Sequence, residues 1–361
     1  MADIQQNTLY LTTPGSYIAR DHLTLQVEVP VYPEDLPREE RTRDNATDTR
    51  KLSIPIHMLE SVCVFGPSTV SPPALDLCWE HGVAVNYLNE WGRLHARMTG
   101  VADTSVMLRR AQFRAADDPV KCAGIARQII AGKLQNSRNS LLRAARENDS
   151  PTEQAALNSV TDALAGQIRG LAEIRELDAV RGAEGLGSAK YFSVFSLMLK
   201  QQREDFAFSG RNRRPPRDRI NCLLSFLYAL VRHDCIAALT AAGLDPFVGF
   251  LHVDRPNRPS LALDLMEEFR PWLADRLAIT LVNRQQIGPD DFKLREGGAV
   301  EFTDAGRKRV ITAYQERKRE NLNHPLLDQN LRIGQLPFIQ ARVLARHLRG
   351  DIADYVPLLP K

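Results

Sequence analysis

The segment Pro246–Pro271, with the sequence PFVGFLHVDRPNRPSLALDLMEEFRP, joins an apolar run to a helix through a loop rich in proline and arginine. His252 follows the apolar run, and Ser260 begins the helix. Leucine and phenylalanine side chains form one stripe of this helix, whereas acids lie on a separate face. The segment therefore predicts a helix that packs on a core and still presents carboxylates near a histidine.

Four side chains of this segment are candidate ligands of a metal ion, namely His252, Asp264, Glu267 and Glu268. Taken singly, a histidine beside an apolar run is usually a core residue, and acids near the start of a helix are usually solvated charge. Taken together, they make a metal site about as plausible as a core histidine with solvated acids. A set of nitrogen and carboxylate ligands without thiolates suits Mg²⁺ or Mn²⁺.

A further ligand has to come from another part of the chain, because one histidine and one carboxylate hold such an ion weakly. Glu184 is the best candidate, in the segment Arg181–Ala189 with the sequence RGAEGLGSA. We expect a helix to end at Arg181, so that Glu184 lies at a helix break whose small neighbours let another backbone or a nucleic-acid strand approach. The segment could equally be a flexible loop with an incidental acid.

Arginine is concentrated in Arg211–Arg219, where five of nine residues are arginine and two prolines stiffen the backbone. Guanidinium groups match the geometry of phosphate oxygens, although a charged surface loop is the ordinary interpretation of such a run. Further basic side chains lie in the helices expected near 303–319 and 337–349. Because the net charge is only +3, this local concentration predicts binding to a phosphate backbone. The predicted DNA contacts are Arg211, Arg213, Arg214, Arg217, Arg219, Arg255 and Arg258.

The distribution of helix and strand signals predicts an α+β chain with two domains. Residues 1–105 contain short alternating segments and one helix after Ser71, which indicates a β-sandwich-like domain. Residues 106–361 read as an all-α catalytic domain with one short β-hairpin near 292–302. Within it we expect a helix from Pro119 toward Leu141, a second from Ser150 to Arg181, and a third from Ser260 to about Val282.

Several classes of protein are disfavoured by what the sequence contains. The five cysteines are scattered and form no Cys-x-x-Cys pair, which argues against a disulfide framework or a structural zinc site and favours the reducing cytoplasm. The sequence shows no secretory leader, and no apolar run reaches the roughly 18 residues of a membrane helix. It also lacks the glycine-rich phosphate loop of ATPases. We therefore expect a soluble cytoplasmic protein that does not hydrolyse ATP and contacts no membrane.

The sequence resembles a known family, the metal-dependent DNA integrase-endonucleases of CRISPR adaptation, called the "Cas-one" family. The resemblance spans nearly the whole chain, and within the family the sequence looks most like the branch that accompanies type I-C systems. The stretch SLALDLMEEFRP at Ser260–Pro271 is its most specific part. The other motifs that carry it are LYLTTPGSY at Leu9–Tyr17, LRRAQFR at Leu108–Arg114, RPPRD at Arg214–Asp218 and GFLH at Gly249–His252.

This resemblance implies a function and a set of site residues. The family's metal-binding and catalytic positions fall on Glu184, His252 and Glu267, and a supporting acid falls on Asp264. The spacing around Glu184 departs from the family's Glu-Gly-x-x-Ala pattern. The implied activity is insertion of short DNA fragments, or spacers, into the CRISPR repeat array by attack of a 3′-hydroxyl, with Mg²⁺ or Mn²⁺ as cofactor. The implied partners are double-stranded prespacer and repeat DNA, a second copy in a homodimer, and the small ferredoxin-like "Cas-two" protein.

Two other functions remain open from the residues themselves. The first is a stand-alone metal-dependent nuclease that cuts branched or single-stranded DNA repair intermediates and joins no strands. The second is a non-catalytic DNA-binding scaffold whose acids form only surface ion pairs.

Overall fold

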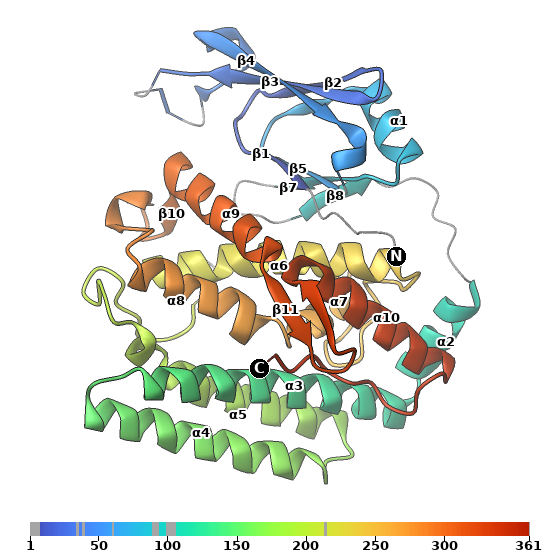
Figure 1. The fold of residues 1–361 in the computed structure, drawn as a ribbon, viewed down its shortest axis with the longest axis vertical. Coiled ribbons are helices and arrows are strands. Elements are labelled where there is room, and N and C mark those ends of the chain that lie inside the picture. The colour runs from blue at the N-terminus through green and yellow to red at the C-terminus, as the bar shows by residue number, and fades with distance from the viewer. Residues whose placement is uncertain are drawn as a thin grey trace. The chain divides into compact units, whose positions relative to one another are not determined.

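The computed structural model describes residues 8–33, 36–37, 40–59, 61–88, 94–98, 106–212 and 215–360. The chain divides into two compact units, Met1–Asp103 and Thr104–Lys361. The first holds strands and one helix, and the second is mainly helical (Figure 1). The α+β class predicted from the sequence is therefore confirmed.

The N-terminal unit contains two four-stranded sheets, with strand orders β1-β5-β7-β8 and β4-β3-β2-β6. In the first sheet β1, β5 and β7 are parallel and β8 is antiparallel to β7; in the second, β2, β3 and β4 are antiparallel and β6 is parallel to β2. The bounds are β1 (Thr8–Leu11), β2 (Tyr17–Asp21), β3 (Thr24–Val31), β4 (Asp48–Pro55), β5 (Ser61–Phe65), β6 (Thr69–Val70), β7 (Ala84–Leu88) and β8 (Leu94–Met98).

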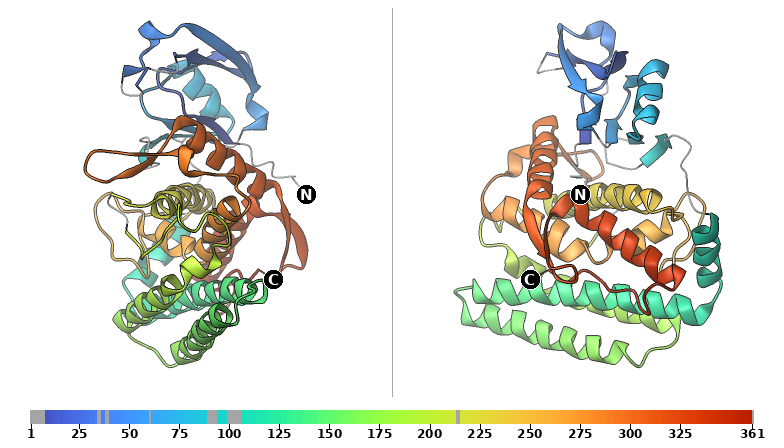
Figure 2. Two further views of the ribbon diagram at one scale, coloured as in Figure 1. Left: turned by 90° about the vertical axis from the view of Figure 1, so that its left-hand side faces the viewer. Right: turned by 45° about the vertical axis from the view of Figure 1, so that its right-hand side comes forward.

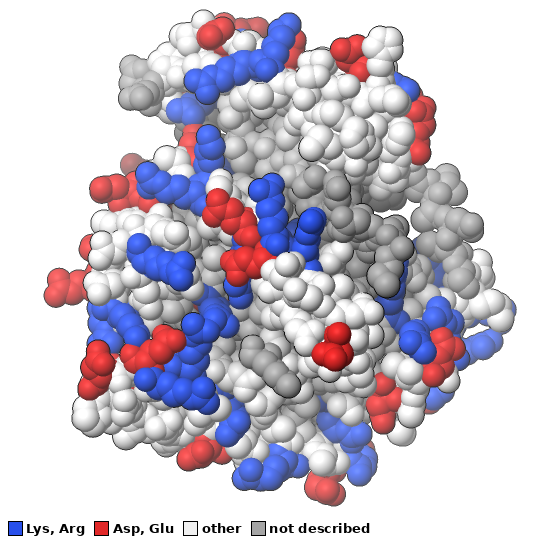
Figure 3. All heavy atoms as spheres, in the orientation of Figure 1, with Lys and Arg blue, Asp and Glu red and all other residues white. Residues whose placement is uncertain are grey.

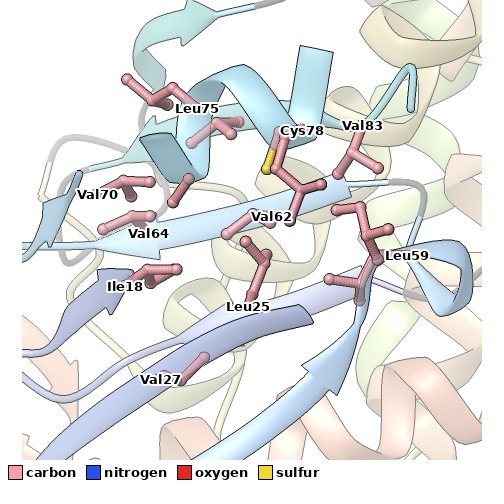
Figure 4. Close-up of a cluster of buried hydrophobic side chains, with 14 of the residues drawn as sticks. Ile18, Leu25, Val27, Leu59, Val62, Val64, Val70, Leu75, Cys78 and Val83 are labelled. Carbon is pink, nitrogen blue, oxygen red and sulfur yellow. The ribbon is translucent and has the colours of Figure 1, made fainter. Parts of the chain in front are cut away.

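The core of this unit forms because apolar residues alternate along strands of both sheets. Ile18 and Leu25 from one sheet and Val62 and Val64 from the other are buried together, with side chains of helix α1 (Pro72–Glu80) beside them (Figure 4). The hydroxyl of Ser71 accepts a hydrogen bond from the backbone N–H of residue 74 and begins α1, as the sequence predicts.

Nine α-helices, one π-helix, three short 3₁₀ turns and two hairpins are the regular elements in the described part of the C-terminal unit. Its α-helices are α2 (Val106–Ala116), α3 (Pro119–Arg146), α4 (Pro151–Leu171), α5 (Leu177–Ser193), α6 (Arg219–Ala241), α7 (Ser260–Met266), α8 (Arg276–Asn283), α9 (Asp304–Arg319) and α10 (Leu336–Arg349). A π-helix, Arg270–Asp275, joins α7 to α8. The expected hairpin is present as β9 (Phe292–Leu294) and β10 (Val300–Phe302), and a second, unexpected one is β11 (Asn321–His324) and β12 (Gln329–Arg332). Short 3₁₀ turns lie at Phe195–Met198, Pro289–Asp291 and Ile333–Gln335.

Helix α3 is the longest of these helices and supports the unit's site. The Asp118 carboxylate caps it by accepting hydrogen bonds from the N–H groups of residues 120 and 121, at 3.0 and 3.2 Å. Helices α4 and α5 pack along α3 in every view (Figures 1 and 2). Helix α6 is long and apolar enough to cross a membrane, but 78% of its apolar window is buried inside the protein, as in the central helix of a core.

The expected helix break at Arg181 is wrong. The break lies at residues 172–176, and α5 then runs without interruption through Glu184 to Ser193. Gly187 is one reason, because α5 passes so close to α3 that a Cβ at this position would overlap the Leu134 side chain. The glycines of this segment therefore permit close helix packing instead of marking a loop.

We predict that Gly187→Ala lowers the free energy of unfolding by about 1–3 kcal/mol, because the new methyl group has to displace Leu134. Gly182→Ala is the matched control, since a Cβ there meets nothing within 4 Å on the same helix. Denaturant unfolding of both variants measures the difference. Equal stability of the two variants would contradict this account of the α3–α5 contact.

The segment from Ser260 to about Val282 is largely helical, as expected, but it is not one regular helix. Helix α7 ends at Met266, and a π-helix containing Pro271 follows. Proline has no N–H for the helical ladder, and π-helical turns are frequent at functional sites. The irregularity lies directly after the two glutamates and redirects the chain there.

Candidate functional site

Glu184 and Glu267 lie on either side of one ammonium group. Glu184 comes from the middle of α5, Glu267 from the end of α7, and Lys133 from α3. The Lys133 Nζ forms an ion pair with Glu184 Oε1 and lies 2.7 Å from Glu267 Oε2. The Lys133 side chain is only 8% exposed, so this pairing takes place at reduced dielectric.

His252 is held against Asp264 in a defined orientation. The imidazole Nδ1 lies 2.7 Å from Asp264 Oδ1, which also accepts the backbone N–H of His252 at 3.0 Å. Asp264 Oδ2 accepts the N–H groups of Phe250 and Leu251 at 2.6 and 3.0 Å. A carboxylate can only accept in this arrangement, so Nδ1 carries the proton and donates it. The Nε2 lone pair is thereby turned toward Glu267, whose Oε1 lies 3.8 Å away.

Asp264 acts by positioning other groups and is not itself available as a ligand. It is fully buried, and both its oxygens are occupied by donors from the His252 segment. Gly249 permits this contact, because a Cβ there would lie 2.9 Å from Asp264 Oδ2. The supporting role in the site that the sequence analysis expects of Asp264 stays a prediction.

Charged neighbours keep Glu267 ionised although it is buried. Arg270 Nη1 lies 2.6 Å from Glu267 Oε1, one helical turn further along the chain. Burial raises the pKa of Glu267, but the charges of Arg270 and Lys133 lower it more, and the net result is a pKa of about 2. The carboxylate is therefore negative at any physiological pH.

The Glu268 side chain points away from Glu267, Lys133 and His252. Its carboxylate accepts hydrogen bonds from the Tyr355 hydroxyl, from Gln340 Nε2 at 3.2 Å and from the Leu358 N–H at 2.5 Å. Burial raises the pKa of Glu268 to about 7, and these three donors limit the rise. The structure thus separates two adjacent acids that the segment alone leaves as competitors, and it places Glu267 with His252.

A cavity of about 500 Å³ opens beside Glu184. Lys133, Glu184 and Arg270 line it, together with Arg211 and Tyr228. The guanidinium groups of Arg211 and Arg270 each lie 5.1 Å from the centre of the Tyr228 ring, which holds both by cation–π contact. The cavity therefore combines positive charge with an aromatic surface.

The predicted DNA-contacting arginines have different surroundings. Arg211 donates to Asn221 Oδ1 and to the Ser225 hydroxyl, and Arg219 donates to the Asp205 carbonyl at 2.6 Å. The exposed side chains are Arg217 and Arg255, and Arg258 is half-buried; Arg213 and Arg214 lie outside the described residues. Figure 3 shows Lys and Arg side chains at several places on this face of the helical unit, most densely at its left, with acidic side chains among them.

The residues of this site fit a divalent cation by their donor chemistry. Two carboxylates and an imidazole Nε2 whose other nitrogen is fixed by a carboxylate are the ligands and outer-shell support that Mg²⁺ or Mn²⁺ takes. Within the described ranges, no three histidine or acidic side chains are already assembled around one point. The ammonium of Lys133 instead supplies the positive charge that Glu184 and Glu267 attract.

Two members of the site, Lys133 and Arg270, were not anticipated from the sequence. Arg270 follows Glu267 by three residues, which is the spacing of a helical ion pair and could have indicated it. Lys133 lies between apolar residues in an otherwise buried part of α3, and a charge at such a position needs a partner. That requirement is a signal for an acid elsewhere in the chain, but it does not say which acid.

Comparison with known proteins agrees with the fold and with the sequence motifs. A family model of the CRISPR associated protein Cas1 matches residues 9–316. The CRISPR-associated endonuclease Cas1 1 of Chlorobaculum tepidum is 44% identical over 353 residues, which cover 98% of each chain. A casposase bound to its integration product has a similar fold, with a TM-score of 0.81 at 21% identity over 97% of this chain and 93% of that one.

A chain of a Cas6-RT-Cas1–Cas2 complex also matches in fold, with a TM-score of 0.77 at 24% identity over 100% of this chain and 37% of its own length. At these low identities both solved structures show the fold alone. The family model and the 44% identical relative each span most of the chain, which therefore belongs to the Cas1 family.

Proposed function

We propose that this protein is a metal-dependent DNA integrase-endonuclease that inserts short DNA fragments into a CRISPR array. The observation that carries the proposal is a connected set of contacts: Glu267 lies 3.8 Å from the Nε2 of His252 and shares the Lys133 ammonium with Glu184, which lines a cavity together with Arg211 and Arg270. Membership of the Cas1 family supports the same function, since the Chlorobaculum tepidum relative is described as an endonuclease. Type I-C association remains part of this proposal.

Each side chain has a distinct part in the proposed reaction. Glu184, His252 and Glu267 would hold Mg²⁺ or Mn²⁺, which supplies Lewis-acid stabilisation of the scissile phosphate. Asp264 fixes the ring of His252, and Arg270 keeps Glu267 ionised and in place. Arg211 and Arg270 border the cavity and neutralise phosphate oxygens, whereas the exposed Arg217 and Arg255 hold the duplex backbone.

The chemistry balances without an external energy source. The oxygen of a DNA 3′-hydroxyl attacks a phosphorus of the repeat, one phosphodiester bond forms, and the bond to the departing 3′-oxygen breaks. The number of phosphodiester bonds is unchanged. This accords with a sequence that contains no ATP-binding loop.

The proposed assembly contains a second copy of the chain and the small Cas2 protein. Its support is the fold shared with a chain of a Cas6-RT-Cas1–Cas2 complex. Prespacer and repeat DNA are the proposed nucleic-acid partners. The casposase of similar fold is described as bound to an integration product, which supports a joining reaction over simple cutting.

A strand-transfer assay tests the proposal. A labelled duplex with 3′-hydroxyl ends, a repeat-containing target duplex and Mn²⁺ are incubated with the protein, with and without Cas2. The expected result is a longer labelled product, which disappears when the fragment ends in a 3′-dideoxynucleotide. If only shortened target strands appear, and the dideoxy end makes no difference, the stand-alone nuclease is the correct function instead.

A further inference from the structure

The C-terminal tail, residues Tyr355–Leu358, returns from α10 and lies along α3 behind the site (Figure 1). It is an irregular segment, yet Tyr355 and Leu358 are almost completely buried. A segment without secondary structure has to find partners for its backbone groups elsewhere. Those partners come from the two elements that carry the site.

In the turn that follows α7 the partner is Glu268, the residue directly after Glu267. Its carboxylate accepts the Tyr355 hydroxyl and, at 2.5 Å, the backbone N–H of Leu358. Gln340 of α10 completes the group, because its Nε2 donates to the Val356 carbonyl at 3.0 Å and to Glu268 at 3.2 Å. The end of α7 is thus fastened to the tail by a fully buried side chain.

On α3 the partners are Asn136 and Gly132. The amide of Asn136 donates to the Leu358 carbonyl at 2.9 Å and to the backbone carbonyl of Glu268 at 2.8 Å. Gly132 precedes Lys133 and touches the tail, since a Cβ at this position would lie 2.5 Å from the Cβ of Pro357. The tail therefore contacts the neighbours in sequence of both Glu267 and Lys133.

We propose that the C-terminal tail is a positioning element that sets the distance between α3 and the end of α7, and with it the placement of Glu267. The inference rests on the proposed function, because it assigns the tail a part in the same site. The tail touches neither DNA nor metal in this role. A catalytic carboxylate displaced by about 1 Å costs up to about a hundredfold in rate, so a structural support of this kind is visible in kinetics.

The substitution Gly132→Ala tests the proposal without removing any hydrogen-bonding group. The new methyl group collides with Pro357 and lifts the tail. Gly124→Ala is the matched control on the same helix, because a Cβ there meets nothing within 4 Å. Both changes raise the helix propensity of α3 equally. The full-length proteins are compared for Mn²⁺ affinity, measured by electron paramagnetic resonance, and for the rate of strand joining.

We expect Gly132→Ala to lower Mn²⁺ affinity about tenfold and joining about tenfold to a hundredfold, and Gly124→Ala to change neither. Adding Pro357→Gly to Gly132→Ala removes the colliding atom and should restore both quantities. Should Gly132→Ala fail to fold, Tyr355→Phe removes a single donor to Glu268 and is measured in the same way.

Equal Mn²⁺ affinity and joining in the Gly132→Ala and Gly124→Ala proteins would overturn the proposal. So would a lower melting temperature with unchanged affinity, which is the result of a purely structural contact. A wild-type protein that binds Mn²⁺ but joins no DNA would reject the proposed integrase function instead. In that case the comparison of Mn²⁺ affinities still decides the role of the tail.

Discussion

His252→Ala is expected to reduce strand joining by a factor on the order of a thousand, which is the scale of losing one electrostatic contact to a transition state. The substitution removes the nitrogen that faces Glu267 and leaves two carboxylates as the remaining ligands. Folding should be nearly unaffected, since Asp264 keeps three backbone donors. The measurements are the strand-transfer rate in Mn²⁺ and a thermal melt.

His57→Ala is the control for this experiment. That side chain is exposed and belongs to the N-terminal unit, so its removal should change neither rate nor melting temperature. Undiminished joining by His252→Ala would remove His252 from the site. Loss of joining accompanied by unfolding would show that the residue is structural, which is the alternative that the sequence leaves open.

Glu267→Gln is expected to lower the free energy of unfolding by about 3–5 kcal/mol, the cost of leaving a buried cation without its anion. Arg270 and Lys133 are both buried and both pair with this carboxylate. The neutral amide keeps the shape of the side chain but not its charge. Chemical denaturation at pH 7 measures the loss, and Glu296→Gln is the control because Glu296 is exposed.

The pH dependence gives this prediction a second test. The pKa of Glu267 is about 2 in the folded protein, below its ordinary value of 4.5, so the unfolded chain binds more protons between these pH values. The contribution of Glu267 is therefore complete above about pH 4.5 and disappears as the pH falls toward 2. The stability difference between wild type and Glu267→Gln should shrink over the same interval. A difference that stays constant from pH 7 to pH 3 would disprove the charge-pair explanation.

The sequence predicts the fold to the extent that local patterns decide it. Alternating strands, the Ser71 cap and the Pro119 start of α3 all depend on residues near in sequence, and all appear in the structure. The prediction that Glu184 lies at a helix break is wrong because glycine occurs in two structural settings. It ends helices, but it also permits close packing, and the contact of Gly187 with Leu134 depends on a helix more than fifty residues away.

The same distinction applies to the site. Glu267 and Arg270 are three residues apart, so periodicity alone brings them together. The pairing of Lys133 with acids from α5 and α7 is set by how three helices pack, and no local pattern contains that information. The separation of Glu268 from Glu267 likewise depends on the tail, which lies about ninety residues further along the chain.

The ammonium of Lys133 also bears on whether the protein needs a metal ion in order to fold. Structural zinc domains stay unfolded until the ion arrives, because their ligands have nothing else to hold them together. Here the chain carries its own counter-charge, and Glu184 and Glu267 are already drawn together by it. Under the proposed function, assembly of the polypeptide and binding of the metal ion would therefore be separate events, and the protein would lose and regain its ion without having to fold again.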